Sequence, residues 1–96
     1  MADYALSRKA DADIQEIASY SVRNWSLARA EAYILRLHEA FQRLAESPHL
    51  GWNIDELRKG YFRYEHESHV VFYKHTGRGI LIVRVLHKSM DVERHL

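Results

Sequence analysis

The sequence predicts an α+β domain in which an N-terminal helical hairpin packs on one face of an antiparallel sheet of three or four strands. Apolar residues recur at helical spacing through residues 7–47, and the pattern changes to runs of aromatic and β-branched residues from residue 61 onward. The length agrees with this, because 96 residues are enough for one domain with a single two-layer core. We therefore expect residues 1–96 to form one domain.

The composition excludes several classes of protein. Hydrophobic residues make up 47% and charged residues 28% of the chain, as in ordinary globular proteins and unlike disordered ones. There is no cysteine, which excludes a disulfide scaffold, a thiolate zinc site and a cysteine nucleophile. The longest aliphatic run, residues 80–83, is far shorter than the ~20 residues of a membrane span, and the first residues do not have the pattern of a signal peptide. We expect a cytoplasmic protein without membrane association.

Two helices are predicted in the first half of the chain. Ser7 is a good N-cap for the first helix, and small and apolar residues follow at spacings of three and four as far as Trp25. Ser26 is a second N-cap, and the same spacing continues until Pro48, which disfavours the helical conformation in the residue before it. So few residues separate the helices that we expect an antiparallel hairpin.

Three consecutive strands are predicted in the second half. Residues 61–66 and 69–74 are rich in strand-forming residues and lie two residues apart, which favours a hairpin. A turn at residues 76–79 precedes residues 80–86, whose nearly continuous aliphatic character predicts the central strand. Residues 4–6 are a candidate edge strand.

Alternation along the last strand predicts which of its side chains face the helices. The residues on the same side as Arg84 are Ile80, Ile82 and Leu86, and the other side carries Leu81, Val83 and Val85. Since a charge cannot lie unpaired between helices and sheet, we expect Arg84 to project from the opposite, open face. An exposed apolar face with an embedded arginine favours the binding of a protein partner.

Positive charge is concentrated in the strand region. Residues 58–88 carry seven Lys and Arg against two Glu, a net charge of +5, in a chain whose net charge is +1. This pattern is typical of a solvated surface or of a face that meets nucleic acid or an acidic protein. A metal-free ribonuclease needs a base, an acid and a cation for the phosphate, which Arg63, Arg84 and His87 can supply. With seven histidines in 96 residues such a set is expected by chance, so the favoured interpretation is that these residues contact a partner or are ordinary edge residues whose hydrogen bonds are satisfied.

No metal or cofactor site is predicted. His66 and His69 flank a turn, but two histidines without further ligands do not make a zinc site. The sequence has no G-x-S-x-G nucleophile elbow and no glycine-rich phosphate loop. Aromatic residues of the strands can stack on single-stranded nucleic acid, although core packing is their commoner role.

Short motifs are spread over essentially the whole chain. They are Leu6-Ser7, Tyr20…Asn24-Trp25, Leu37…Phe41…Leu44-Ala45-Glu46-Ser47-Pro48…Gly51, Glu56-Leu57-Arg58…Gly60-Tyr61-Phe62-Arg63 and Ser68-His69-Val70-Val71-Phe72-Tyr73. The most specific is the pattern R-V-L-H-x-x-M-D at residues 84–91. In these motifs the chain resembles the ParE toxins of the ParE/RelE superfamily.

The resemblance implies a RelE/ParE-like fold and a bacterial type II toxin, neutralised by a cognate ParD-like antitoxin in a toxin–antitoxin hetero-oligomer. ParE-type members act on DNA gyrase and stall it on cleaved DNA, whereas RelE-type members cut mRNA on the ribosome. RelE-like nucleases tend to end in a segment with a catalytic Tyr or His beside many basic residues, and this chain has no Tyr after Tyr73. The resemblance therefore favours a gyrase poison without catalytic residues. The alternative is a RelE-like mRNA endonuclease that uses Arg63, Arg84 and His87.

We expect the antitoxin to bind the open face of the sheet around Phe72, Tyr73 and Arg84, with Met90 as a further contact. Pairing of Arg84 with a carboxylate of the antitoxin would leave no buried charge unpaired. The polar C-terminal segment, residues 88–96, is the candidate element for contact with gyrase. The alternative for this segment is that Met90 and Leu96 pack against the domain.

Overall fold

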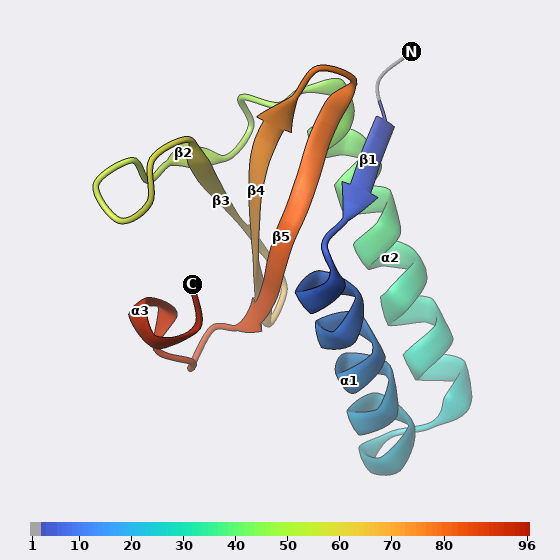
Figure 1. The fold of residues 1–96 in the computed structure, drawn as a ribbon. Helices are drawn as coiled ribbons and strands as arrows, with labels where there is room; N and C mark the ends of the chain where they lie inside the picture. The colour runs from blue at the N-terminus through green and yellow to red at the C-terminus, as the bar shows by residue number, and fades with distance from the viewer. Residues whose placement is uncertain (1–2) are drawn as a thin grey trace.

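The computed structural model describes residues 3–96 (Figure 1). Its elements in chain order are β1 (Asp3–Leu6), α1 (Arg8–Asn24), α2 (Leu27–Glu46), β2 (Trp52–Asn53), β3 (Tyr61–His66), β4 (His69–Thr76), β5 (Gly79–His87) and α3 (Val92–His95). The hairpin of α1 and α2 packs on one face of the sheet, as predicted. Within residues 3–96 no helix is both long enough and apolar enough to span a bilayer.

Both long helices begin at the predicted serine caps. The Ser7 Oγ accepts a hydrogen bond from the backbone N–H of Ala10 at 3.0 Å, and the Ser26 Oγ accepts one from that of Arg29 at 3.1 Å. The second helix ends at Glu46, shortly before Pro48. Two residues separate the helices, which run antiparallel and lie side by side (Figure 1).

The sheet has five strands in the order β1-β5-β4-β3-β2, one or two more than predicted. Residues 4–6 do form an edge strand, but β1 pairs with β5 in parallel, so the sheet is mixed rather than antiparallel. The middle strand is β4, and β5 lies between β1 and β4. The prediction that residues 80–86 form the central strand is therefore wrong by one position, because the short β2 extends the sheet on the far side of β3.

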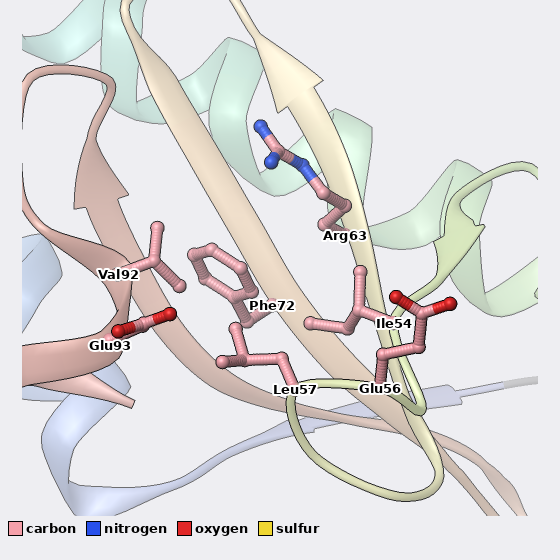
Figure 2. A pocket seen from close by; sticks show the side chains of 7 residues that line it. All are labelled: Ile54, Glu56, Leu57, Arg63, Phe72, Val92 and Glu93. Carbon is pink, nitrogen blue, oxygen red and sulfur yellow. The ribbon is translucent and has the colours of Figure 1, made fainter.

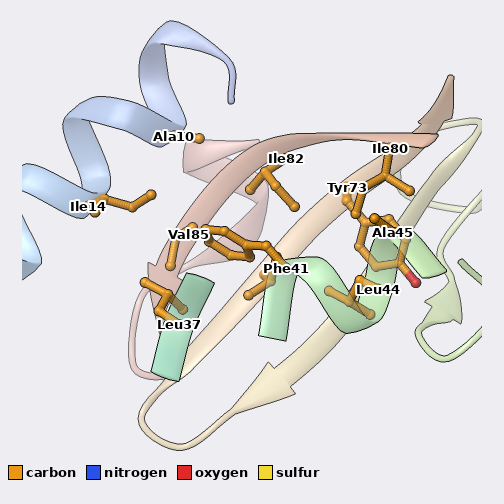
Figure 3. Packing of buried hydrophobic residues seen from close by; sticks show 11 residues of the cluster. Ala10, Ile14, Leu37, Phe41, Leu44, Ala45, Tyr73, Ile80, Ile82 and Val85 are labelled. Carbon is orange, nitrogen blue, oxygen red and sulfur yellow. The ribbon is translucent and has the colours of Figure 1, made fainter. Parts of the chain in front are cut away.

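The main core lies between the helical hairpin and the sheet (Figure 3). Its buried members are Ala10, Ile14, Leu37, Phe41, Leu44, Ala45, Val71, Tyr73, Ile80, Ile82 and Val85. Full burial of each large aliphatic or aromatic side chain contributes about 1.5–3 kcal/mol. The amphipathic stripe of α2 supplies most of the helical members, which is why the spacing of its apolar residues predicts the helix correctly.

A β-bulge interrupts the pairing of β4 with β5. Phe72 pairs with Arg84, but the next residue, Tyr73, pairs with Ile82. Val83 therefore has no partner residue in β4, and the regular alternation of side chains along β5 shifts at this point.

The bulge reverses the predicted facing of the first half of β5. Ile80 and Ile82 belong to the core beneath the helices together with Val85, whereas Leu81 and Val83 do not. Unbroken alternation from residue 80 to residue 86 predicts the opposite arrangement, with Leu81 and Val83 facing the helices and Ile80 and Ile82 facing away. The bulge makes this prediction wrong for these four residues. Beyond the bulge the predicted facing of Val85 is confirmed.

Candidate partner-binding face

A row of four side chains crosses the sheet on the face away from the helices. Cross-strand pairing aligns Trp52 of β2 with Arg63 of β3, Arg63 with Phe72 of β4, and Phe72 with Arg84 of β5. Aromatic rings and guanidinium groups thus alternate across four strands. The Trp52 ring is exposed, whereas Phe72 is fully buried.

The C-terminal segment covers the middle of this face. A second, small core consists of Val70, Phe72 and Leu86, with Ile54, Val92 and Leu96 packed against it. The Arg84 Nη1 donates to the carbonyl oxygen of His95 at 2.7 Å, and the Arg58 guanidinium donates to that of Leu96. The face predicted to be open is therefore partly closed. Of the C-terminal residues, Leu96 packs against the domain and Met90 stays exposed.

A cavity of about 410 Å³ remains on this face, between the C-terminal segment and the loop that follows β2 (Figure 2). Its lining residues are Ile54, Glu56, Leu57, Arg63, Phe72, Val92 and Glu93. Figure 2 shows the aliphatic side chains converging on the Phe72 ring, with the two glutamates on opposite sides. A concave apolar floor with a charged rim is suited to an apolar side chain of a partner protein.

Arg84 is already paired within the chain. Its Nε and Nη2 donate to the two carboxylate oxygens of Asp13 in α1 at 2.8 and 2.9 Å, and both side chains are 15% exposed. The hydrogen bond to Asp13 is also the main reason that the pKa of Arg84 is raised. The carboxylate expected from the antitoxin is thus supplied by Asp13, which corrects the expected role of Arg84 as a free anchor for a partner.

The N-terminal end of α1 closes the edge of β5 where β1 stops. The backbone N–H of Ser7 donates to the Ile82 carbonyl at 3.0 Å, and its hydroxyl donates to the Val83 carbonyl at 2.7 Å. The backbone N–H of Val85 donates to Asp13 Oδ2 at 2.9 Å. These contacts occupy groups that an added strand would use, so this part of the edge is protected from pairing with another chain.

We call the face of the sheet away from the helices, which carries Phe72 and Arg84, the candidate partner-binding face; Tyr73 does not lie on it. It is buried in the main core, where its hydroxyl donates to the Pro48 carbonyl at 2.8 Å and accepts from the Gly51 N–H at 2.9 Å. Burial raises the pKa of this phenol. Phe72 and Tyr73 are neighbours in β4 and point to opposite faces, so the expectation that both contact the partner is wrong for Tyr73.

The three residues of the ribonuclease alternative do not converge. Arg63 and Arg84 lie on the partner-binding face, whereas His87 follows Val85 by two residues and therefore lies on the helix side of β5. The Arg63 Nη2 is 3.1 Å from the carboxylate of Glu65, and the His87 Nδ1 is 2.7 Å from the Ser89 hydroxyl. His87 is therefore on the opposite face of the sheet from Arg63 and Arg84.

A group of histidines lies at the end of the sheet beneath α2, where His69 pairs with His87 across the strands next to the turn that His66 and His69 flank. The His69 Nδ1 is 2.6 Å from the Tyr33 hydroxyl, and the His69 ring lies 5.5 Å from the ring of its cross-strand partner His87. Burial, with a smaller contribution from the positive charges of His87 and His66, lowers the pKa of His69 to about 4. Burial also raises the pKa of Tyr33 to about 12. Among residues 3–96 no group of three or more potential ligands has the geometry of a metal site.

The histidine group predicts a dependence of stability on pH. Because the pKa of His69 is 6.5 in the unfolded chain and about 4 in the folded one, the unfolded state binds more protons between these values. The stabilisation is therefore complete above pH 6.5 and decreases as the pH falls toward 4. We expect the free energy of unfolding to fall by ~2 kcal/mol over this range. This is less than the shift in the pKa of His69 alone would give, because the imidazole is partly exposed to solvent.

Urea unfolding between pH 4.5 and 7.5 measures this loss. The control is His69→Gln, which removes the titrating group and should flatten the dependence over this range. An equal pH dependence in the wild type and in His69→Gln would show that other groups cause it.

Comparison with known proteins supports one family. The family described as "ParE toxin of type II toxin-antitoxin system, parDE" matches residues 4–92. A protein named Toxin ParE1 from Mycobacterium tuberculosis H37Rv is 42% identical over 94 residues, 97% of this chain and 96% of that protein. Toxin ParE1 of Caulobacter vibrioides is 42% identical over 96 residues, 100% of this chain and 99% of that protein.

The fold has a counterpart among solved structures. A chain of the structure described as "Chromosomal ParDE TA system from P. aeruginosa" superposes with a TM-score of 0.77. It is 20% identical in sequence, and the match covers 91% of this chain and 96% of that one. The family match over residues 4–92 and the 42% identity to the two ParE1 toxins show that the chain belongs to the ParE toxin family of type II toxin–antitoxin systems.

Proposed function

We propose that this toxin acts on DNA gyrase in the bacterial cytoplasm by stabilising its cleaved-DNA complex, and that a cognate ParD-like antitoxin neutralises it. The observation that carries this proposal is the separation of Arg63 and Arg84 from His87 on opposite faces of the sheet. A gyrase poison needs no catalytic residues, because tighter binding to the cleavage intermediate than to the resting enzyme is enough to raise the amount of cleaved DNA. Membership of the ParE toxin family supports the same function.

The antitoxin site that we propose is the partner-binding face, centred on the cavity above Phe72. An apolar antitoxin side chain would replace solvent against Ile54, Leu57 and Val92. Met90 is 45% exposed and belongs to the same C-terminal segment, so we retain it as a contact at the rim. Arg84 supports this face through its bond to His95 rather than through a direct ion pair with the antitoxin.

The test combines purified toxin, gyrase and supercoiled plasmid. We expect cleaved DNA to accumulate and ribosome-bound mRNA to stay intact. His87→Ala should accumulate cleaved DNA like the wild type, because a non-catalytic toxin does not need an imidazole at this position. Ribosome-dependent cleavage of mRNA that disappears in His87→Ala would contradict the proposal and support the RelE-like endonuclease, in which an acid or base contributes ~10²-fold or more.

Adding the antitoxin should abolish the accumulation of cleaved DNA. Leu57→Glu brings a charge to the wall of the cavity, and we expect at least ~10-fold weaker antitoxin binding, since a buried unpaired charge is costly. Leu35→Glu is the matched control, because Leu35 is also exposed but lies on α2, outside the cavity. Equal antitoxin affinity of both variants would remove the cavity from the interface.

A further inference from the structure

The turn between α1 and α2 exposes large apolar side chains that the fold does not use. Trp25 is 61% and Leu27 63% exposed, and Tyr20 and Val22 are also exposed. None of these four residues belongs to either core cluster. We call residues 20–30 the hairpin tip. Figure 1 shows that it projects beyond the end of the sheet, well separated from α3 and the C-terminal segment.

The hairpin tip carries positive charge without compensating acids. Residues 20–30 contain Arg23 and Arg29 and no Asp or Glu. Neither arginine has an acidic group within 4.0 Å among residues 3–96. The guanidinium carbon of Arg29 lies 5.2 Å from the centre of the Trp25 ring, a cation–π contact that holds both groups at the surface.

The position of Arg29 is unfavourable for the isolated helix. It lies in the first turn of α2, which contains no acidic residue, although the positive end of a helix dipole favours acidic groups. An exposed tryptophan likewise contributes little to folding, because its ring stays in water. Tryptophan, tyrosine and arginine are the residues most enriched among those that dominate the affinity of protein–protein interfaces.

We propose that the hairpin tip is the surface through which this toxin binds its protein target. This inference rests on the proposed function, so the target is gyrase. The complementary site on gyrase is an apolar pocket that receives the Trp25 ring, with carboxylates at its rim that pair with Arg23 and Arg29. We expect the tip to contact the protein part of the gyrase–DNA complex rather than the DNA. Four apolar or aromatic side chains accompany the two arginines at the tip, whereas contacts to a phosphate backbone need cations and hydrogen-bond donors.

The tip, proposed to bind gyrase, lies apart from the cavity that is proposed to bind the antitoxin. The cavity proposed for the antitoxin is lined by residues of β3, β4, α3 and the loop after β2, and none of its lining residues comes from α1 or α2. The hairpin tip consists of the end of α1 and the beginning of α2. A substitution at the tip should therefore change binding to gyrase and leave binding to the antitoxin unchanged.

A substitution at the tip and one elsewhere on α2 make a matched pair for the test. Trp25→Ala removes a side chain that is 61% exposed at the tip, and Leu35→Ala removes one that is 63% exposed on α2 outside both the tip and the cavity. We expect Trp25→Ala to weaken binding to the gyrase–DNA complex by ~30-fold, the effect of losing a dominant interface residue, and to reduce cleaved DNA accordingly. Leu35→Ala should change this affinity less than ~3-fold. Trp25→Ala should keep the thermal midpoint and the antitoxin affinity of the wild type.

A second variant tests the charges of the tip. The double substitution Arg23→Glu and Arg29→Glu should reduce the rate of association with gyrase and the dependence of that rate on salt. Wild-type gyrase affinity of Trp25→Ala would overturn the inference, and so would a loss of antitoxin affinity, which would assign the tip to the antitoxin interface. If the wild-type toxin does not bind gyrase or raise the amount of cleaved DNA, the proposed function itself is wrong, so the two failures are distinguishable.

Discussion

Asp13→Ala should lower the free energy of unfolding by ~3 kcal/mol, because it removes one partner of a largely buried ion pair. The Asp13 carboxylate accepts three hydrogen bonds, from the Nε and Nη2 of Arg84 and from the backbone N–H of Val85. The Arg84 side chain, only 15% exposed, would lose its only carboxylate partner among the described residues. Chemical unfolding of the purified protein measures the change.

Two variants isolate the contribution of this pair. Asp11→Ala removes an exposed carboxylate from the first turn of the same helix, where it accepts a hydrogen bond from the Gln15 side chain at 3.2 Å, and should change stability by less than ~1 kcal/mol. Asp13→Asn keeps an acceptor oxygen and loses the charge, so its effect should lie between the other two. Equal effects of Asp13→Ala and Asp11→Ala would show that the pair contributes nothing to stability. Arg84→Glu sets two carboxylates against each other, so it tests folding rather than antitoxin binding.

Gly79→Ala should be about as destabilising, ~3 kcal/mol, and should act through the N-terminal strand. Gly79 pairs with Asp3 and has a φ of +155°, which side chains other than hydrogen rarely allow. A Cβ atom at this position would lie 1.8 Å from the Asp3 carbonyl oxygen, so β1 would have to move away from β5. The expected loss combines backbone strain with the loss of strand pairing.

Hydrogen exchange and chemical unfolding together test this effect. In Gly79→Ala the amides of β1 should exchange faster than in the wild type, and those of β3 should be affected least. Gly77→Ala is the matched control two residues earlier in the same turn, where an added Cβ meets nothing within 4 Å. If both alanines have the same small effect, the close approach of β1 to Gly79 does not constrain the sheet.

The elements that the sequence predicts correctly are those determined by local interactions. A serine side chain caps a helix through atoms three residues away, so Ser7 and Ser26 set both helix starts without reference to the rest of the chain. The facing of β5 depends instead on the bulge at Val83, which arises from the register against β4. The alternation of residues along the sequence does not reveal this bulge. It therefore predicts the wrong face of the sheet for Ile80 and Ile82.

The candidate site was only partly predictable from local rules. Phe72 was correctly associated with the face that carries Arg84, since the two residues are cross-strand partners. Alternation along β4 places Phe72 and Tyr73 on opposite faces, so the expectation that both contact the partner overlooked a local rule rather than a distant contact. The pairing of Arg84 with Asp13 joins residues 71 positions apart, and four-residue α3 is too short for a periodic signal.

The parallel pairing of β1 with β5 has a consequence for synthesis on the ribosome. β1 is translated before the helices and the other strands, and residues 79–82, with which it pairs, are translated after β2, β3 and β4. The helical hairpin depends on local contacts and can form early, but its apolar side then lacks the sheet that covers it. A product whose translation stops before residue 79 has no β5 and therefore neither the completed sheet nor the partner-binding face. We expect such truncated chains to be recognised as unfolded by the cell's proteases and not to bind the antitoxin.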